Sequence, residues 1–275
     1  MRILLRPFCR PLNVINETKP FIWVQMFKRL FLTTFLFLSG WAFTLAQPGG
    51  KIVIDNDIGL IPLSDSVYVH VTWHKLENSG RFPSNGLIVI RNGRALMVDT
   101  PMDNAKTERL TRFLKEAMSA DLTTLVVGHF HDDCLGGLGY LQSIGVESIA
   151  NALTIAQCKK LGLPVPSTAF TDSLTFDFNG ERIECRFFGP GHSFDNITVW
   201  IPRTKILFGG CLVKSMDSTG LGNLSDAVVP EWDNTIKKVM LSYPEAVTVV
   251  PGHGDFGGRE LLTHTLRLVE KEKSK

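Results

Sequence analysis

Two histidines and an aspartate stand at alternating positions in the run His129-Phe-His131-Asp-Asp133. Alternate side chains of an extended backbone point the same way, so both imidazoles can converge on one cation while Asp133 turns towards a neighbouring position. Imidazole and carboxylate are zinc ligands, and a catalytic zinc keeps one position open for water. By itself this spacing is a moderate signal, because two histidines at a strand end can instead bond to backbone.

Three more ligand-type residues, His192, Cys211 and His253, lie in glycine-containing runs, each expected just after a strand. Glycine permits the tight turns that bring such residues together. A lone histidine more often bonds locally, and a lone cysteine is more often part of a core. Four separate strand ends that all carry ligand-type residues nevertheless favour a metal site over four independent coincidences.

The elements that must position these residues are mainly short strands. Asn92-Gly93 and Asn179-Gly180 predict hairpin turns, and Asp103 and Asn151 predict helix N-caps. We expect strands at 51–54, 60–62, 67–73, 86–91, 94–99, 123–127, 174–179, 181–188, 197–201, 205–208 and 247–250, and helices from 103, 151–161, 231–243 and from 259. This α/β pattern predicts two sheets packed face to face with helices outside, a four-layer arrangement.

Residues 1–46 have the features of a signal peptide. Lys28 and Arg29 precede an apolar run over 30–38, and Thr44-Leu45-Ala46 is a small-residue cleavage site, with Met26 a possible true start. The apolar run is short for a spanning helix, although an N-terminal membrane anchor is the alternative. We therefore expect an exported, periplasmic protein whose residues 47–275 form a single catalytic domain without stable membrane association.

Composition and charge narrow the choice of partners. The 275 residues are 44% hydrophobic and 20% charged, as in a soluble globular protein. Without residues 1–46, the net charge of +2 becomes −3, which excludes a polyanion-binding surface and so disfavours nucleic acid. Four cysteines remain after the leader, too few for a disulfide scaffold, and pairing of Cys158 with Cys185 is left open. A monomer is favoured, because no extended apolar stripe is left over.

These motifs resemble those of the metallo-β-lactamases over essentially all of residues 51–270. The resemblance is closest to subclass B1, and within it to the Bacteroides-type zinc carbapenemases. It rests on His129-Phe-His131-Asp-Asp133-Cys134-Leu-Gly-Gly, Gly-His192-Ser, Gly-Gly-Cys211-Leu-Val-Lys214 and Pro-Gly-His253-Gly-Asp. It implies the four-layer αβ/βα sandwich of that family and two zinc ions per chain, one held by His129, His131 and His192 and the other by Asp133, Cys211 and His253.

The resemblance also implies a reaction. A metal-bound hydroxide would hydrolyse the β-lactam amide bond with a broad spectrum that includes carbapenems, conferring antibiotic resistance. Asp133 and Asn223 match catalytic residues of the family, Lys214 matches its substrate-carboxylate binder, and Asn223 and Trp73 would also contact substrate. Trp73 begins the segment 73–82, expected to be the flap between two strands.

Other residues near the motifs have weaker assignments. Asp99 is either an outer hydrogen-bond partner of the ligand loop or a strand-terminal cap. Cys134 replaces the arginine common in related enzymes and is expected close to the second zinc. We expect His70, His74 and His264 to be structural or solvent-facing.

Two other functions fit parts of the pattern. A related two-metal hydrolase would act on lactones or thioesters, although the Cys211–Lys214 pair disfavours it. A periplasmic zinc-binding or scavenging protein would take up metal without turnover. A serine mechanism is disfavoured, because neither Ser-x-x-Lys nor Gly-x-Ser-x-Gly occurs.

Overall fold

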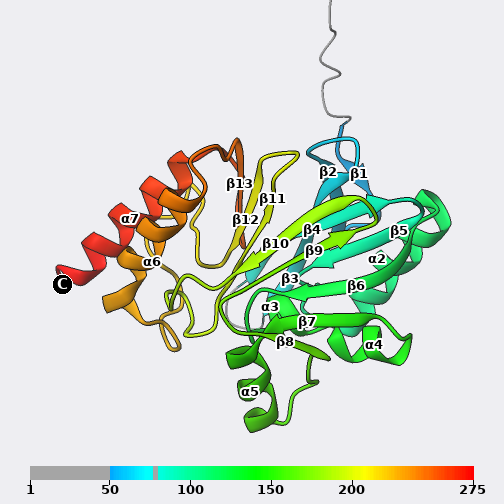
Figure 1. Ribbon diagram of the computed structural model, residues 1–275, viewed down its shortest axis with the longest axis horizontal. Helices are drawn as coiled ribbons and strands as arrows, with labels where there is room; N and C mark the ends of the chain where they lie inside the picture. Colours follow the sequence, from blue (N-terminus) through cyan, green and yellow to red (C-terminus); the bar gives the residue numbers. More distant parts are fainter. Residues whose placement is uncertain (1–49, 77–79) are drawn as a thin grey trace, which may run out of the picture. The chain divides into compact units, whose positions relative to one another are not determined.

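Two β-sheets make up the centre of the computed structural model, which describes residues 50–76 and 80–275 (Figure 1). Eight strands form the first sheet in chain order: β1 (Ile52–Val53), β2 (Ile58–Pro62), β3 (Val67–Leu76), β4 (Gly80–Arg91), β5 (Arg94–Val98), β6 (Asp121–Val127), β7 (Glu147–Asn151) and β8 (Thr168–Phe170). The second sheet has the order β13-β12-β11-β10-β9, with β9 (Ser173–Phe178), β10 (Glu181–Arg186), β11 (Thr198–Ile201), β12 (Ile206–Gly210) and β13 (Thr248–Pro251).

Strand direction follows the connections. Strands β1 to β5 are an antiparallel meander, whereas β5 to β8 run parallel and are joined by helices. Parallel neighbours need such crossovers because a tight hairpin reverses the chain. The crossover helices are α2 (Asn104–Met118), α3 (Asp132–Leu135), α4 (Leu138–Ser143) and α5 (Ala152–Leu161); α6 (Val229–Ser242) joins the parallel pair β12 and β13, and α7 (Glu260–Lys273) ends the chain.

Three hydrophobic layers hold these elements together. Along β5, Leu96 and Val98 pack between the sheets, while Ala95 and Met97 pack on the outer face with α2, α4 and α5. The other outer layer places α6 and α7 against the second sheet around Trp232. Figure 1 shows α6 and α7 beside one sheet and α2, α4 and α5 beside the other. The predicted four-layer α/β fold is confirmed.

The two hairpin turns and the two helix N-caps that local signals in the sequence predicted are present in the structure. Asn92 and Asn179 both adopt positive φ before a glycine that does the same, the geometry of a tight hairpin turn. The Asp103 carboxylate accepts a hydrogen bond from the Lys106 amide at the start of α2. Asn151 caps α5 in the same way through the Leu153 amide.

The flap segment differs from the prediction. Residues 73–82 were expected to separate two strands, but β3 continues to Leu76 and β4 begins at Gly80, with 77–79 outside the described residues. The buried His74 ring contacts the Thr72 hydroxyl of its own strand at 2.9 Å and the Ser84 hydroxyl of β4 at 3.0 Å, and the second contact holds the two strands together here. A long hairpin therefore stands where a loop was predicted.

The predicted leader and its cleavage site, including Met26, lie outside the described residues, so the 46/47 boundary stays a prediction. No helix in the described part of the chain has the length and apolar character needed to cross a bilayer. The cysteines from 134 onward are all free. Cys158 packs in the outer layer of the first sheet and Cys185 between the sheets, so they do not pair.

Candidate active site

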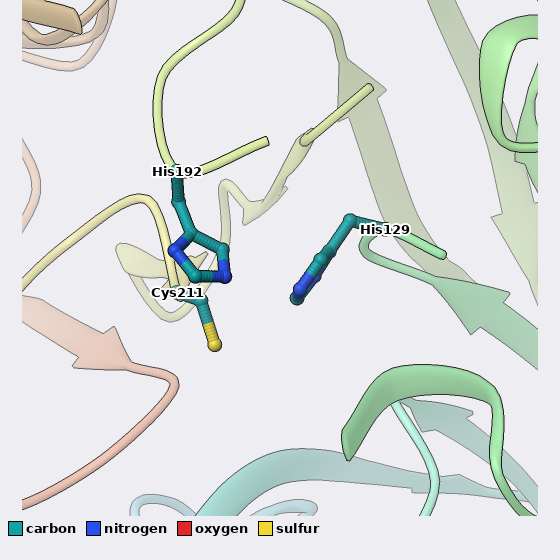
Figure 2. Close-up of side chains that lie close together, drawn as sticks. All are labelled: His129, His192 and Cys211. Carbon is teal, nitrogen blue, oxygen red and sulfur yellow. The ribbon is translucent and has the colours of Figure 1, made fainter. Parts of the chain in front are cut away.

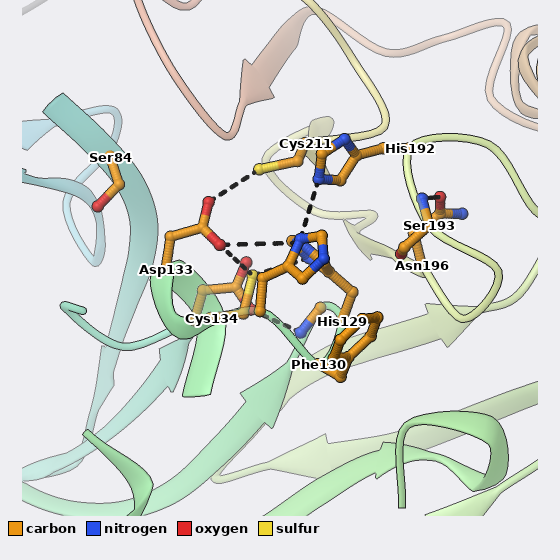
Figure 3. A network of polar contacts seen from close by, with 12 residues as sticks. Ser84, His129, Phe130, Asp133, Cys134, His192, Ser193, Asn196 and Cys211 are labelled. Carbon is orange, nitrogen blue, oxygen red and sulfur yellow. Dashed lines mark hydrogen bonds and ion pairs between the residues drawn. The ribbon is translucent and has the colours of Figure 1, made fainter. Parts of the chain in front are cut away.

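Four loops converge at one edge of the two sheets. Strand β6 leads into His129 and His131, β12 into Cys211, and β13 into His253. His192 follows β10 after a longer irregular segment. Figure 3 shows residues of three of these loops facing one another. All six predicted metal ligands are therefore brought into the same region.

Three imidazoles form the first donor cluster. His131 Nδ1 lies 2.9 Å from His129 Nε2 and 3.3 Å from His192 Nε2. The ring planes are nearly perpendicular, with the His129 ring at 78° to His131 and 88° to His192. The nitrogens thus point to a common position from different directions, as ligands of one tetrahedral cation do.

A carboxylate, a thiol and an imidazole form the second cluster. Asp133 Oδ2 lies 3.1 Å from Cys211 Sγ and 3.0 Å from His253 Nε2, and the last two atoms are 3.4 Å apart. Gly252 allows this approach, because a Cβ there would come within 2.4 Å of Cys211 Sγ. The two clusters adjoin, since ligand atoms of His129, His192 and Cys211 all lie within 4.8 Å of one another (Figure 2).

Hydrogen bonds on the far side of two rings determine which nitrogen is free. His253 Nδ1 lies 2.8 Å from the Pro83 carbonyl oxygen. A carbonyl can only accept, so Nδ1 donates to Pro83, and Nε2 is the nitrogen that faces Asp133 and Cys211 and is available to bind a metal. Asp226 Oδ2 lies 3.0 Å from His131 Nε2 and leaves the lone pair of His131 on Nδ1 in the same way. Such contacts are usual for histidines that bind metals.

Two buried carboxylates hold the backbone on either side of His129. The Asp99 carboxylate accepts from the Gly128 amide at 2.5 Å, and Asp195 accepts from the Phe130 amide at 3.0 Å. Asp195 also accepts from the Thr154 hydroxyl of α5 at 2.7 Å. Asp99 therefore is a hydrogen-bond partner of the ligand loop, the first of its two predicted roles. Asp195 was missed, because nothing in its local sequence distinguishes it.

Burial sets the protonation of the donors. It lowers the pKa of His129 to about 4 and that of His192 well below its usual value, so both rings are neutral at pH 7. Burial works against the ionised Asp133, but the hydrogen bonds from His253 and Cys211 and the charges of His129 and His253 together outweigh it, and the pKa of Asp133 falls well below its usual range. Burial raises the pKa of the Cys211 thiol. Neutral imidazoles with free lone pairs are the form that coordinates a cation.

A cavity of about 470 Å³ opens beside the clusters and is lined by Phe82, Lys214, Asn223 and several of the donors. Its size suits a small molecule. Lys214 Nζ lies 5.4 Å from the centre of the buried Trp232 ring, and no ion pair to Lys214 is found among residues 50–76 and 80–275. The cavity therefore offers a cation to an anionic ligand.

Comparison with known proteins shows to which family the chain belongs. The family model for the metallo-beta-lactamase superfamily matches residues 79–253. The metallo-beta-lactamase type 2 of Bacteroides fragilis is 47% identical over 240 residues, which cover 87% of this chain and 96% of that protein. The chain belongs to the metallo-β-lactamase superfamily.

Solved structures agree with this assignment. A metallo-beta-lactamase from Pontibacter korlensis matches with a TM-score of 0.75 at 35% identity, over 78% of this chain and 99% of that one. FIM-1 of Pseudomonas aeruginosa, a metallo-beta-lactamase solved in a mono-zinc form, matches with a TM-score of 0.73 at 32% identity, over 81% and 99%. The predicted fold family is confirmed.

Zinc fits the donors of this metallo-β-lactamase. Members of the family are zinc-dependent, and the two clusters contain the imidazole, thiolate and carboxylate groups that zinc binds. His192 Nδ1 is buried without a hydrogen-bond partner among the described residues, while its Nε2 faces the first cluster. The donors therefore suit the metal that the family uses.

Trp73 does not line the cavity of this metallo-β-lactamase. Its ring lies beneath the Arg81 guanidinium at 4.7 Å, and Arg81 pairs with Asp57. Neighbouring strand positions face opposite sides, and the side that faces the cavity carries Phe82, which pairs with His74. Phe82 is therefore the aromatic residue of the flap that lines the cavity, and contact of Trp73 with substrate stays a prediction.

Asn223 and Cys134 have defined surroundings. Asn223 Oδ1 accepts from the Ser225 amide, which is turn chemistry, so only its side-chain amide group remains to donate into the cavity. Cys134 Sγ lies 2.9 Å from His129 Nδ1 and 4.0 Å from Asp133 Oδ1, hence behind the first cluster as well as beside the second. His70, His74 and His264 bond to protein groups, as expected of structural histidines.

Proposed function

We propose that this protein hydrolyses the amide bond of β-lactam antibiotics with two zinc ions, one at each donor cluster. Its spectrum is broad and includes carbapenems, so that it confers resistance. The observation that carries the proposal is the adjacency of the three-histidine cluster to the Asp133–Cys211–His253 cluster beside a cavity that Lys214 also lines. The names of relatives from Bacteroides fragilis and Pseudomonas aeruginosa support the substrate class.

His129, His131 and His192 would hold one zinc, and Asp133, Cys211 and His253 the other. When bound, zinc in such sites lowers the pKa of water to near 7 and polarises carbonyl groups. The negative charge of Asp133 and of the Cys211 thiolate balances part of the cationic charge. Asp133 would act as such a ligand, and its catalytic assignment rests on the resemblance to the family.

Lys214 and Asn223 would act on the substrate itself. β-Lactam drugs carry a carboxylate beside the lactam nitrogen, and the Lys214 ammonium can donate to it. The side-chain amide of Asn223 can donate to the lactam oxygen as negative charge develops there. Both residues line the same cavity as the metal donors, so one substrate molecule could contact all of them.

The central experiment measures hydrolysis of a carbapenem by the zinc-loaded protein, before and after removal of zinc by a chelator. We expect hydrolysis that is lost on chelation and recovered when zinc is added back. A rate that is unchanged after verified removal of zinc contradicts the zinc mechanism. Zinc analysis of the loaded protein tests the number of ions, with two per chain expected.

A substrate panel separates the alternatives. A cephalosporin, a lactone and a thioester would be compared under the same conditions with the same zinc-loaded protein. We expect the cephalosporin to be hydrolysed far faster than the others. Preference for the lactone or thioester favours the related two-metal hydrolase, and tight zinc binding without turnover of any substrate favours the zinc-binding protein.

The cellular location is proposed on the sequence alone. Lys28, Arg29 and the following apolar run are the basis for export and for cleavage after Ala46. Fractionation of expressing cells and mass spectrometry of the mature protein would test this. A mature chain in the periplasm that begins at residue 47 is expected, and a chain that retains residues 26–46 in the membrane fraction contradicts it.

A further inference from the structure

Asp226 makes a contact with the first donor cluster that its position in the sequence does not suggest. Its Oδ2 lies 3.0 Å from Nε2 of His131, which is 95 positions earlier in the chain. The two side chains are 41% and 23% exposed, so the contact lies at the wall of the cavity. Exposed ion pairs add little to folding stability, and the effect of this contact must be sought elsewhere.

The contact determines which nitrogen of His131 can bind a metal. A carboxylate oxygen accepts hydrogen bonds, so it selects the form of the ring in which Nε2 carries the hydrogen. The lone pair is then on Nδ1, and Nδ1 is the atom that faces His129 and His192. Rotation of the His131 ring would break the bond to Asp226 and turn Nδ1 away from this cluster.

We propose that Asp226 is a positioning residue, which fixes the His131 ring for zinc and joins the loop 216–227 to the three-histidine cluster. The proposal rests on the proposed function for the identity of the metal, but it concerns metal binding rather than the reaction. Asp226 would contact neither substrate nor metal and would act only through His131.

Hydrogen bonds connect the loop around Asp226 to Asn223 on one side and to Gly191, next to His192, on the other. Ser225 Oγ donates to Asp226 Oδ2, and the Ser225 amide donates to Asn223 Oδ1, so the bond to His131 is connected to the residue proposed to assist the substrate oxygen. On the other side, the Val228 amide donates to the Gly191 carbonyl, next to His192. Binding of zinc by His131 should therefore also order the segment that carries Asn223.

The test uses three full-length variants: Asp226→Ala, Asp226→Asn and Asp217→Asn. Asp217 is an exposed acid of the same loop, so its replacement matches the change in charge. Zinc affinity is measured by competition with a chromophoric chelator, and the state of the His131 ring by ¹⁵N NMR of the imidazole nitrogens. Urea unfolding of each variant shows whether the fold is retained.

We expect Asp226→Ala to weaken binding of zinc at the three-histidine cluster by about 10- to 100-fold, the usual effect of losing an outer partner of a ligand histidine. Asp226→Asn should lose less zinc affinity, because the oxygen of its side-chain amide can still accept a hydrogen bond from His131 Nε2. Asp217→Asn should bind zinc as the wild type does. In the zinc-free protein, the ¹⁵N signals of His131 should show hydrogen on Nε2 in the wild type and a mixture of both forms in Asp226→Ala.

Zinc affinity of Asp226→Ala within twofold of the wild type overturns the proposal, as does an equal loss in Asp217→Asn. An unchanged ring form in a variant with weakened binding overturns the stated cause. None of these measurements involves a β-lactam. If Asp226→Ala weakens zinc binding in a protein that hydrolyses no β-lactam, the proposed function fails while this inference stands.

Discussion

Removal of the Lys214 side chain should weaken substrate binding far more than it slows the chemical step. The ammonium lies over the buried Trp232 ring and faces the cavity without an ion-pair partner among the described residues. Burial lowers the pKa of Lys214, while the charges of Cys211 and Asp133 counteract this. An ammonium held in such a half-buried place should gain free energy when a carboxylate binds.

The size of the effect follows from the cost of losing a charged hydrogen bond. Such a bond contributes about 1.5–3 kcal/mol, which corresponds to roughly 10- to 150-fold in KM for Lys214→Ala. The turnover number should change by less than about threefold, because the carboxylate is bound equally in the ground and transition states. Lys214→Arg retains the charge and the stacking on Trp232, and should recover most of the affinity.

Steady-state hydrolysis of one cephalosporin and of its carboxylate methyl ester provides the decisive comparison. Single-turnover titration checks that KM reports binding. Wild-type protein should bind the ester as poorly as Lys214→Ala binds the acid, and the substitution should hardly affect the ester. If Lys214→Ala weakens acid and ester by the same factor, Lys214 does not bind the carboxylate and the reasoning from its position is wrong.

Three further predictions concern the donors and their support. Cys211→Ser should lower affinity for the second zinc and turnover together, whereas Cys158→Ala, which removes a buried thiol that belongs to neither donor cluster, should leave zinc content at two; metal analysis and kinetics decide. Asp195→Ala leaves the buried Phe130 amide without its acceptor and should reduce the free energy of unfolding in urea by about 1–3 kcal/mol, while Asp195→Asn, which retains an acceptor, should lose less. Burial lowers the pKa of His70 to about 4 from an unfolded value of about 6.5, so the unfolded state takes up the proton first as the pH falls. The free energy of unfolding of the zinc-free protein should therefore decrease by up to about 3 kcal/mol between pH 6.5 and pH 4. The decrease should be smaller in His70→Gln.

The sequence predicted that the six donor residues lie together, because strand ends and glycines are local signals. Val127 ends a strand and Gly128 follows it, so the direction of His129 can be deduced from neighbours alone. The hairpin turns at Asn92 and Asn179 were predictable for the same reason, since the residue pair itself selects the backbone conformation. Burial on both faces also made β5 recognisable as a continuous apolar run.

The missed features depend on contacts between distant parts of the chain. Asp195 accepts a hydrogen bond from the Phe130 amide, which is 65 positions away in the sequence, and no pattern near Asp195 indicates that contact. The flap was expected to separate two strands because it mixes apolar with flexible residues, yet His74 is buried and bonds to hydroxyls of its own and the neighbouring strand. Trp73 was assigned from its place in the flap that the family resemblance implies, whereas the register of β3 against β4 decides that Phe82 lines the cavity.

Hydrogen bonds between protein groups connect the two sheets at the donor clusters. Asn85, in β4 of the first sheet, donates from its backbone to the Gly252 carbonyl and from its side chain to the Pro251 and Gly254 carbonyls, on both sides of His253. The Ile197 amide likewise donates to the Gly128 carbonyl, beside His129. Because these bonds join backbone to backbone or to a buried amide, the positions of the donor loops are determined by folding of the sheets. Zinc would then bind to donors that folding has already brought together, although they come from both halves of the chain.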